Sequence, residues 1–317
     1  MQIWIDIFLL ALGFVLLIQS AKLFVNSSVA IAKRLRIPTF IIGLTVVAMG
    51  TSAPELVISV SAAMGGSSDL AIANIVGSNL FNLLFIVGFC ALINPISIKI
   101  QAIARDYWVF FAATAFLLFM VVLFHDTIPR YGSFVLLAGF IVYMATLIKK
   151  TIKQNAENEG DVEGIDEVVR PLWQSIILTI LGAAIIMGGG QLTVASAVNI
   201  ADTIGVSERI IGLTIVAIGT SLPEFITTII ACRKNEGEFA LGFIIGSCIF
   251  NVMFVLGIAG LITPLAIGAG IAFDLAVLTV GAFVFFLFAK SKERLVRSEG
   301  FVMLLIYSGY MGFVLFA

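Results

Sequence analysis

The sequence predicts an all-α polytopic membrane protein with ten transmembrane helices in two inverted five-helix repeats. Three observations lead to this fold class. Of the 317 residues, 61% are hydrophobic and only 12% are charged, whereas soluble domains have roughly 25% charged residues. The apolar segments are long and continuous, which excludes the ~10-residue alternating strands of a membrane β-barrel. One motif also occurs twice, at matching places in the two halves of the chain.

Ten apolar segments are long enough for the ~20 residues that a membrane-spanning helix needs. Helices are expected because backbone polar groups in lipid must find partners within their own segment. We expect spans near residues 3–30, 38–64, 69–94, 106–124, 131–149, 172–200, 209–232, 239–262, 271–289 and 300–317. The first span lacks the basic start of a signal peptide, so it is expected to be retained as a helix.

The lysines and arginines between the spans predict the orientation, since cytoplasmic loops carry an excess of these residues. One set of loops holds Lys33, Arg34, Arg36, Lys99, Arg105, Lys149, Lys150, Lys153, Arg170, Arg233, Lys234, Lys290, Lys292, Arg294 and Arg297. The opposite set holds only Arg130 and Arg209. Both termini should therefore face the exterior. The net charge of −1 offers no basic surface for a nucleic-acid partner.

The two halves of the sequence repeat each other at a spacing of 169 residues, the difference between Gly212 and Gly43. At this spacing "GLTVVAMGTSAPE", from Gly43, aligns with "GLTIVAIGTSLPE", from Gly212. The stretch "GSNLFN" from Gly77 aligns with "GSCIFN" from Gly246. Each copy holds five spans, an odd number, so the second copy must enter the membrane from the opposite side. Inverted repeats place a transporter's substrate site near the midplane, between the copies.

The repeat divides the chain into three parts. We expect a first five-helix unit at 1–152, a cytoplasmic linker at 153–170 and a second, inverted unit at 171–317. The acidic residues of the linker are Glu157, Glu159, Asp161, Glu163, Asp166 and Glu167. They could indicate a regulatory calcium loop, but they do not follow the EF-hand pattern. A solvated linker is therefore the favoured interpretation.

Each copy has a proline inside an apolar segment. Pro54 and Pro223 lack an N–H, and each ring clashes with the carbonyl four residues earlier. Each helix should therefore break there, leaving the carbonyls of residues 48–51 and 217–220 free to turn away from the helix axis. Such backbone is tolerated in a membrane only where it is buried in protein or lines a cavity.

The residues around the two breaks supply oxygen atoms. Glu55 and Glu224 are equivalent, and intramembrane carboxylates are rare and usually functional. The hydroxyl and amide side chains nearby are Thr51, Ser52, Ser78 and Asn82 in the first copy, and Thr220, Ser221, Ser247 and Asn251 in the second. Such ligands suit calcium and other hard cations, not zinc or copper. Because a single hydroxyl often bonds its own helix, the two glutamates carry this prediction.

Two other classes fit the sequence less well. A cation channel would also use buried carboxylates, but inverted repeats with broken helices favour alternating access. An enzyme is not expected, because the single histidine, His125, lies near a span end and gives no Ser-His pair at the motifs. We expect no cofactor.

The two "GTSxPE" and two "GSxxxN" segments resemble the α-repeats of the cation/calcium exchanger superfamily. They are most similar to those of the sodium/calcium exchangers and their prokaryotic relatives. The resemblance implies ion ligands at the Ala48 carbonyl, Thr51, Ser52, Glu55, Ser78 and Asn82, and at the Ala217 carbonyl, Thr220, Ser221, Glu224, Ser247 and Asn251. It also implies a prokaryotic cell (inner) membrane, and that the long first and sixth spans slide as a gate.

The function implied by the resemblance is secondary antiport of calcium against sodium, by alternating access at a midplane site. Two ionised glutamates carry a charge of −2, which one calcium or two sodium ions match. A calcium/proton antiporter remains the alternative, although the proton-coupled branch typically has Gly-Asn where this chain has Thr-Ser. With Asn at position 251 the chain resembles the potassium-independent exchangers, because the potassium-dependent branch has Asp at this position. The partners expected are inorganic cations and the lipid bilayer, and the oligomeric state is left open.

Overall fold

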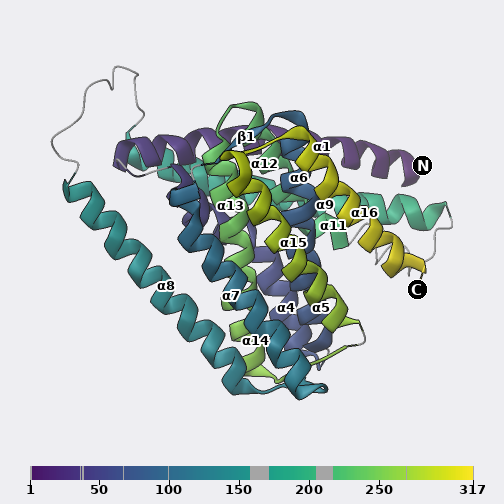
Figure 1. The fold of residues 1–317 in the computed structure, drawn as a ribbon. Helices are drawn as coiled ribbons and strands as arrows, with labels where there is room; N and C mark the ends of the chain where they lie inside the picture. The colour runs from purple at the N-terminus through teal and green to yellow at the C-terminus, as the bar shows by residue number, and fades with distance from the viewer. Residues whose placement is uncertain are drawn as a thin grey trace.

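The protein is described here from a computed structural model, which covers residues 2–35, 37, 39–66, 68–98, 100–157, 171–204, 217–268 and 270–316. The described chain is a helical bundle with four two-residue strands in its connections (Figure 1). The helices of the first half are α1 (Gln2–Leu35), α2 (Thr39–Ile42), α3 (Ala48–Thr51), α4 (Ala53–Met64), α5 (Ser68–Leu80), α6 (Val87–Ile93), α7 (Ile100–Phe124) and α8 (Arg130–Glu157). Those of the second half are α9 (Leu172–Thr203), α11 (Ala217–Thr220), α12 (Leu222–Arg233), α13 (Gly237–Ile249), α14 (Leu256–Ile262), α15 (Ile271–Lys292) and α16 (Arg297–Phe316).

Within the described residues, three short π-helical segments interrupt these helices: η1 (Gly43–Val47), η2 (Phe81–Ile86) and η4 (Phe250–Val255). The last two are equivalent under the repeat, because Phe81 and Phe250 are 169 residues apart. Each lies in the middle of a long apolar run, between α5 and α6 or between α13 and α14. Short π segments inside α-helices are frequent at functional sites.

The chain is an all-α integral membrane protein. Seven of the described helical segments are long and apolar enough to cross a membrane, and the bent pair Phe40–Thr51 and Ala53–Met64 makes an eighth. The predicted span 209–232 lies partly outside the described residues, and the predicted span 300–317 corresponds to α16. The full count of ten therefore stays a prediction.

The division into units also stays a prediction. Helix α8 continues to Glu157, past the predicted unit boundary at 152, because the residues "KQNAE" at 153–157 extend a helix that is already formed. The rest of the predicted linker, residues 158–170, lies outside the described residues.

Two runs form the centre of the bundle. In the segment Gly237–Ile262, 94% of the most apolar stretch is buried, and in Ser68–Ile93 the buried share is 78%. In the other five candidate spans it is 22–39%. Glycine allows other backbone to approach the central run closely: a Cβ added to Gly246 would lie 2.2 Å from the Leu44 carbonyl oxygen. Four side chains of the predicted site, Ser78, Asn82, Ser247 and Asn251, therefore lie on the two most buried segments.

The connections pair across the two halves. Strand β1 (Ile96–Ser97) pairs with β4 (Arg294–Leu295), and β2 (Thr127–Ile128) pairs with β3 (Leu265–Ala266). Under the repeat β1 is equivalent to β3, since Leu265 follows Ile96 by 169 residues. The two nevertheless lie at opposite ends of the bundle, β1 beside the start of α16 and β3 beyond the end of α14 (Figure 1). Each copy thus contributes one strand to each end.

A similar hydrogen bond joins the last two long helices of each copy, α7 to α8 and α15 to α16. The Tyr143 hydroxyl of α8 donates to Asp106 of α7 at 3.0 Å. In the second half, the Tyr310 hydroxyl of α16 donates to Asp274 of α15 at 3.1 Å. The repeat therefore extends beyond the aligned motifs, to the last two helices of each half.

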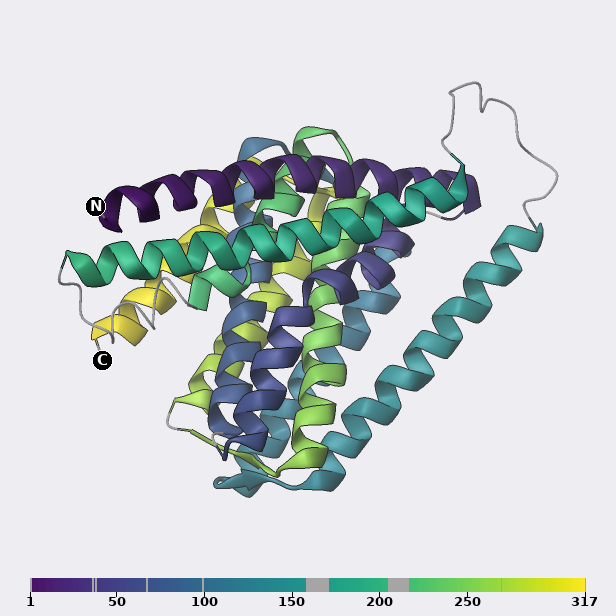
Figure 2. The same cartoon turned by 180° about the vertical axis from the view of Figure 1, so that it is seen from behind.

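The two longest helices, α1 and α9, lie side by side across one face of the bundle (Figure 2). A Cβ added to Gly13 would lie 3.1 Å from the Gly189 carbonyl, so small residues let the two backbones touch. Polar pairs join both ends of the contact, Asn199 to Asp6 at 3.1 Å and Thr179 to Ser27 at 3.0 Å.

Candidate cation site

Both predicted helix breaks are confirmed. The first break lies at Ser52 (φ −82°, ψ 10°), between α3 and α4, where the axis bends by 47°. The second lies at Ser221 (φ −92°, ψ 8°), between α11 and α12. Pro54 and Pro223 follow in the first turn of the next helix, a position that tolerates proline because its N–H would have no partner there.

The prediction that the Ala48 carbonyl turns away from the helix is wrong, whereas its role as a cation ligand stays a prediction. The helix continues through Thr51, so the Ala48 carbonyl accepts the Ser52 N–H at 3.1 Å and the Thr51 hydroxyl at 3.3 Å. It is therefore not free of helical hydrogen bonds. The carbonyl that loses its donor is that of Gly50, because its partner four residues later is Pro54, which has no N–H.

Most of the predicted side chains are buried in the core, and some of them meet across the two copies. Those that are less than 4% exposed are Thr51, Ser52, Glu55, Ser78, Asn82, Ser221, Glu224, Ser247 and Asn251. The hydroxyls of Ser52 and Ser247 are 2.7 Å apart, and the Asn82 amide donates to Ser247 at 3.4 Å. Thr220 is only partly buried, and for Ala217 the structure describes the backbone at the start of α11.

The two glutamates lie near each other, each surrounded by hydroxyls of the opposite copy. The Glu55 carboxylate interacts electrostatically with Glu224 and with Ser221 of the second copy. The Glu224 carboxylate lies near Thr51 and Ser52 of the first copy. Two buried carboxylates so close repel each other when both are ionised, and either a bound cation or a proton relieves this repulsion.

Seven buried oxygen atoms of the predicted ligand residues have no hydrogen-bond partner within the described part of the chain. They are Glu55 Oε2, Ser78 Oγ, Asn82 Oδ1, Ser221 Oγ, both carboxylate oxygens of Glu224, and Asn251 Oδ1. Buried polar atoms almost always have a hydrogen-bond partner, and leaving such an atom without one costs about 1–3 kcal/mol. Such a concentration of unpartnered oxygens fits a site built for hard cations.

The residues with known structure contain no group of three or more His, Cys, Asp and Glu side chains that could hold a metal ion. The predicted ligands offer only carboxylate, hydroxyl, amide and carbonyl oxygens, whereas zinc and copper centres use nitrogen and sulfur ligands. The charge of the predicted site comes from two carboxylates, and its remaining oxygens are neutral.

Sequence reasoning missed Asn79. This α5 residue is fully buried, donates to the Cys248 carbonyl at 3.2 Å and accepts from the Asn251 amide at 3.1 Å. The signal was available, since Asn79 is a polar residue inside an apolar run and next to Ser78. It was overlooked because its equivalent in the second copy is Cys248, so that the repeat does not mark it.

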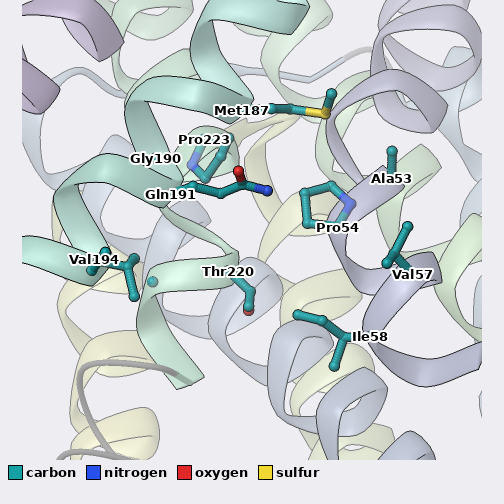
Figure 3. A pocket seen from close by; sticks show the side chains of 12 residues that line it. Ala53, Pro54, Val57, Ile58, Met187, Gly190, Gln191, Val194, Thr220 and Pro223 are labelled. Atoms are coloured by element: carbon teal, nitrogen blue, oxygen red, sulfur yellow. The ribbon is translucent and has the colours of Figure 1, made fainter. Parts of the chain in front are cut away.

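An apolar cavity of about 400 Å³ lies beside the two breaks, between α9 and helices α4, α11 and α12 (Figure 3). Pro54 and Pro223 both line it, and Thr220 brings one predicted ligand to its wall. The Gln191 side chain of α9 points toward Pro54 (Figure 3). At Gly190, a Cβ would lie 3.2 Å from the Pro223 ring, so α9 packs directly against the second break.

Paired broken helices, a buried two-carboxylate oxygen site and matched halves define a membrane cation antiporter of the exchanger class. The comparison with known families agrees. The sequence profile of the family described as "Sodium/calcium exchanger protein" matches residues 5–149 and again residues 174–316. The chain belongs to this family, whose members are transporters and not enzymes.

Individual relatives cover nearly the whole chain. The protein CaxA from Alkalimonas amylolytica is 37% identical over 304 residues, covering 94% of this chain and 95% of its own. Sodium/calcium exchanger MaX1 from Methanosarcina acetivorans is 31% identical, with 98% of each chain covered. Among solved structures, the sodium-calcium exchanger NCX_Mj soaked with 10 mM sodium superimposes with a TM-score of 0.84 at 29% identity, covering 98% of this chain and 99% of its own.

Proposed function

We propose that this protein exchanges calcium for sodium by alternating access at one site between the two copies. The observation that carries the proposal is the cluster of seven unpartnered buried oxygens around Glu55 and Glu224. Both glutamates are at most 1% exposed, and a buried negative charge is stabilised by a bound cation. The names of MaX1 and NCX_Mj support sodium and calcium as the ions.

The predicted ligand set follows from the same site. The set consists of Thr51, Ser52, Glu55, Ser78 and Asn82 with the Ala48 carbonyl, and Thr220, Ser221, Glu224, Ser247 and Asn251 with the Ala217 carbonyl. One calcium ion or two sodium ions neutralise the two carboxylates. A third sodium ion leaves a charge of +1 and makes exchange electrogenic. Calcium and sodium then compete for one site, and each ion set stabilises its own loaded state.

Inverted topology of the two five-helix units is part of the proposal. It is supported by β1 and β3, which are equivalent in the repeat but lie at opposite ends of the bundle. With the basic loops cytoplasmic, both termini face the exterior, and residues 153–170 form a cytoplasmic linker. The contact of α1 with α9, and the cavity between α9 and both prolines, give these helices a surface and a space for a sliding gate.

Proteoliposomes test the coupling ion. Vesicles loaded with sodium and diluted into sodium-free buffer at constant pH should take up calcium. The hydroxyls of Ser52 and Ser221 coordinate sodium but cannot release protons at physiological pH, which favours sodium over protons. Calcium uptake that follows an imposed pH gradient and ignores sodium would instead establish calcium/proton antiport. Single-channel conductance would contradict antiport altogether.

A further inference from the structure

Asn79 is hydrogen-bonded to the predicted ligand Asn251, and the equivalent residue in the other copy is not an asparagine. Its side chain is fully buried on α5, between Asn251 and the backbone of α13. It is not in the predicted ligand set, and both ends of its amide are used. These two hydrogen bonds determine the orientation of the Asn251 amide.

The orientation of both amides is fixed by one carbonyl. The Cys248 carbonyl can only accept, so the Asn79 group that faces it, at 3.2 Å, must be Nδ2. The Asn79 oxygen then faces Asn251, and Asn251 must offer its own Nδ2, at 3.1 Å. This leaves Asn251 Oδ1 turned away from Asn79, buried and without a partner in the described part of the chain.

The other copy has no such device. Asn82, the equivalent of Asn251, donates to the Ser247 hydroxyl at a long 3.4 Å. A hydroxyl can donate as well as accept, so Ser247 does not fix which end of the Asn82 amide faces the site. The residue equivalent to Asn79 is Cys248, and a thiol is a weak donor and acceptor.

We propose that Asn79 is a positioning residue that aims the Asn251 oxygen at the cation and selects an amide over a carboxylate at residue 251. A carboxylate there would set its oxygen against the Asn79 oxygen. Turning the Asn79 amide round would instead set oxygen against the Cys248 carbonyl. Asn79 thereby holds the charge of the site at −2, the value on which the proposed calcium-for-sodium exchange rests.

A double-mutant cycle tests whether Asn79 acts through Asn251. The variants are Asn79→Leu, Asn251→Ala and the two combined, with Asn79→Ala as a smaller change in case leucine disturbs folding. The readouts on purified protein are the melting temperature without added cations and the calcium and sodium concentrations that raise it half-maximally. Outer-shell partners of metal ligands typically contribute 10–100-fold to affinity, so we expect Asn79→Leu to raise the calcium midpoint about tenfold. The combined variant should be no worse than Asn251→Ala alone.

A matched control exists at the end of the same run. Asn94 also donates its amide to a backbone carbonyl, that of Cys232 at 3.0 Å, and to an asparagine oxygen, that of Asn235 at 3.1 Å. Asn94→Leu should lower the melting temperature without moving either cation midpoint. Additive effects of Asn79→Leu and Asn251→Ala, or a lower melting temperature with unchanged midpoints, would overturn the proposal. If sodium stabilised the wild-type protein and calcium did not, calcium exchange would be contradicted. The double-mutant cycle would then be evaluated from the sodium midpoints.

Discussion

The two copies of the motif have nearly the same sequence but different hydrogen bonds. In one cross-copy pair the Ser52 and Ser247 hydroxyls are 2.7 Å apart. The equivalent pair is Ser221 and Ser78, and in the described chain neither hydroxyl has a partner. Equal ligands therefore occupy unequal environments. If the repeats are inverted, exchanging the two environments describes the opposite state of the transporter, with the Ser221–Ser78 pair closed and the Ser52–Ser247 pair open.

The largest expected effect tests what the copies share. Glu55→Gln and Glu224→Gln each remove one of two buried charges, and each carboxylate attracts a nearby cation by several kcal/mol at an effective dielectric constant of ~20. Both variants should therefore reduce sodium-driven calcium uptake to below about 1% of wild type while remaining folded. Glu293→Gln, at an exposed turn, is the control. Near-normal uptake by both site variants would refute the shared two-carboxylate site.

The next prediction concerns the proposed inversion. Met64 and Arg233 are equivalent positions, 169 residues apart, and both are exposed. An impermeant thiol reagent should label Met64→Cys only from the outside and Arg233→Cys only from the cytoplasm. The native cysteines are buried, so their background should be low. Labelling of both positions from one side is incompatible with inverted copies.

A smaller effect distinguishes the packing of the copies. Gly77 and Gly246 are equivalent, but a Cβ would meet nothing within 4 Å at Gly77 and would lie 2.2 Å from the Leu44 carbonyl oxygen at Gly246. Gly246→Ala should destabilise the protein by about 1–3 kcal/mol through overpacking. Gly77→Ala should be neutral or slightly stabilising, since alanine favours helix. Thermal unfolding of the two variants in detergent measures the difference, and equal melting temperatures would contradict it.

The smallest expected effect concerns the two equivalent serines at the helix breaks, Ser52 and Ser221. Ser52→Ala removes the hydrogen bond to Ser247, which should cost about 1 kcal/mol of stability without added cations. Ser221→Ala removes a hydroxyl that lies near the Glu55 carboxylate but is not bonded to Ser78, so it should cost less. Both should weaken the sodium dependence of transport. A larger loss of stability for Ser221→Ala would mean that the unequal environments are not those of the cation-free protein.

The membrane class, the repeat, the helix breaks and the residue types of the site follow from the amino-acid sequence alone. These features depend on composition, on chain order and on covalent properties such as the missing N–H of Pro54. These properties are local, and the motif features occur in both copies of the repeat. Glu55 and Glu224 were identified for the same reason, and the structure places both in the core.

Which of these groups meet depends on the three-dimensional packing of the helices. The Ser52–Ser247 and Asn82–Ser247 bonds join residues 195 and 165 positions apart, and no periodicity in the sequence encodes such pairings. The Asn79–Asn251 bond breaks the symmetry of the repeat, so a search for equivalent residues could not find it. The Ala48 carbonyl keeps its hydrogen bond to the Ser52 N–H because the helix bends at Ser52 and not earlier.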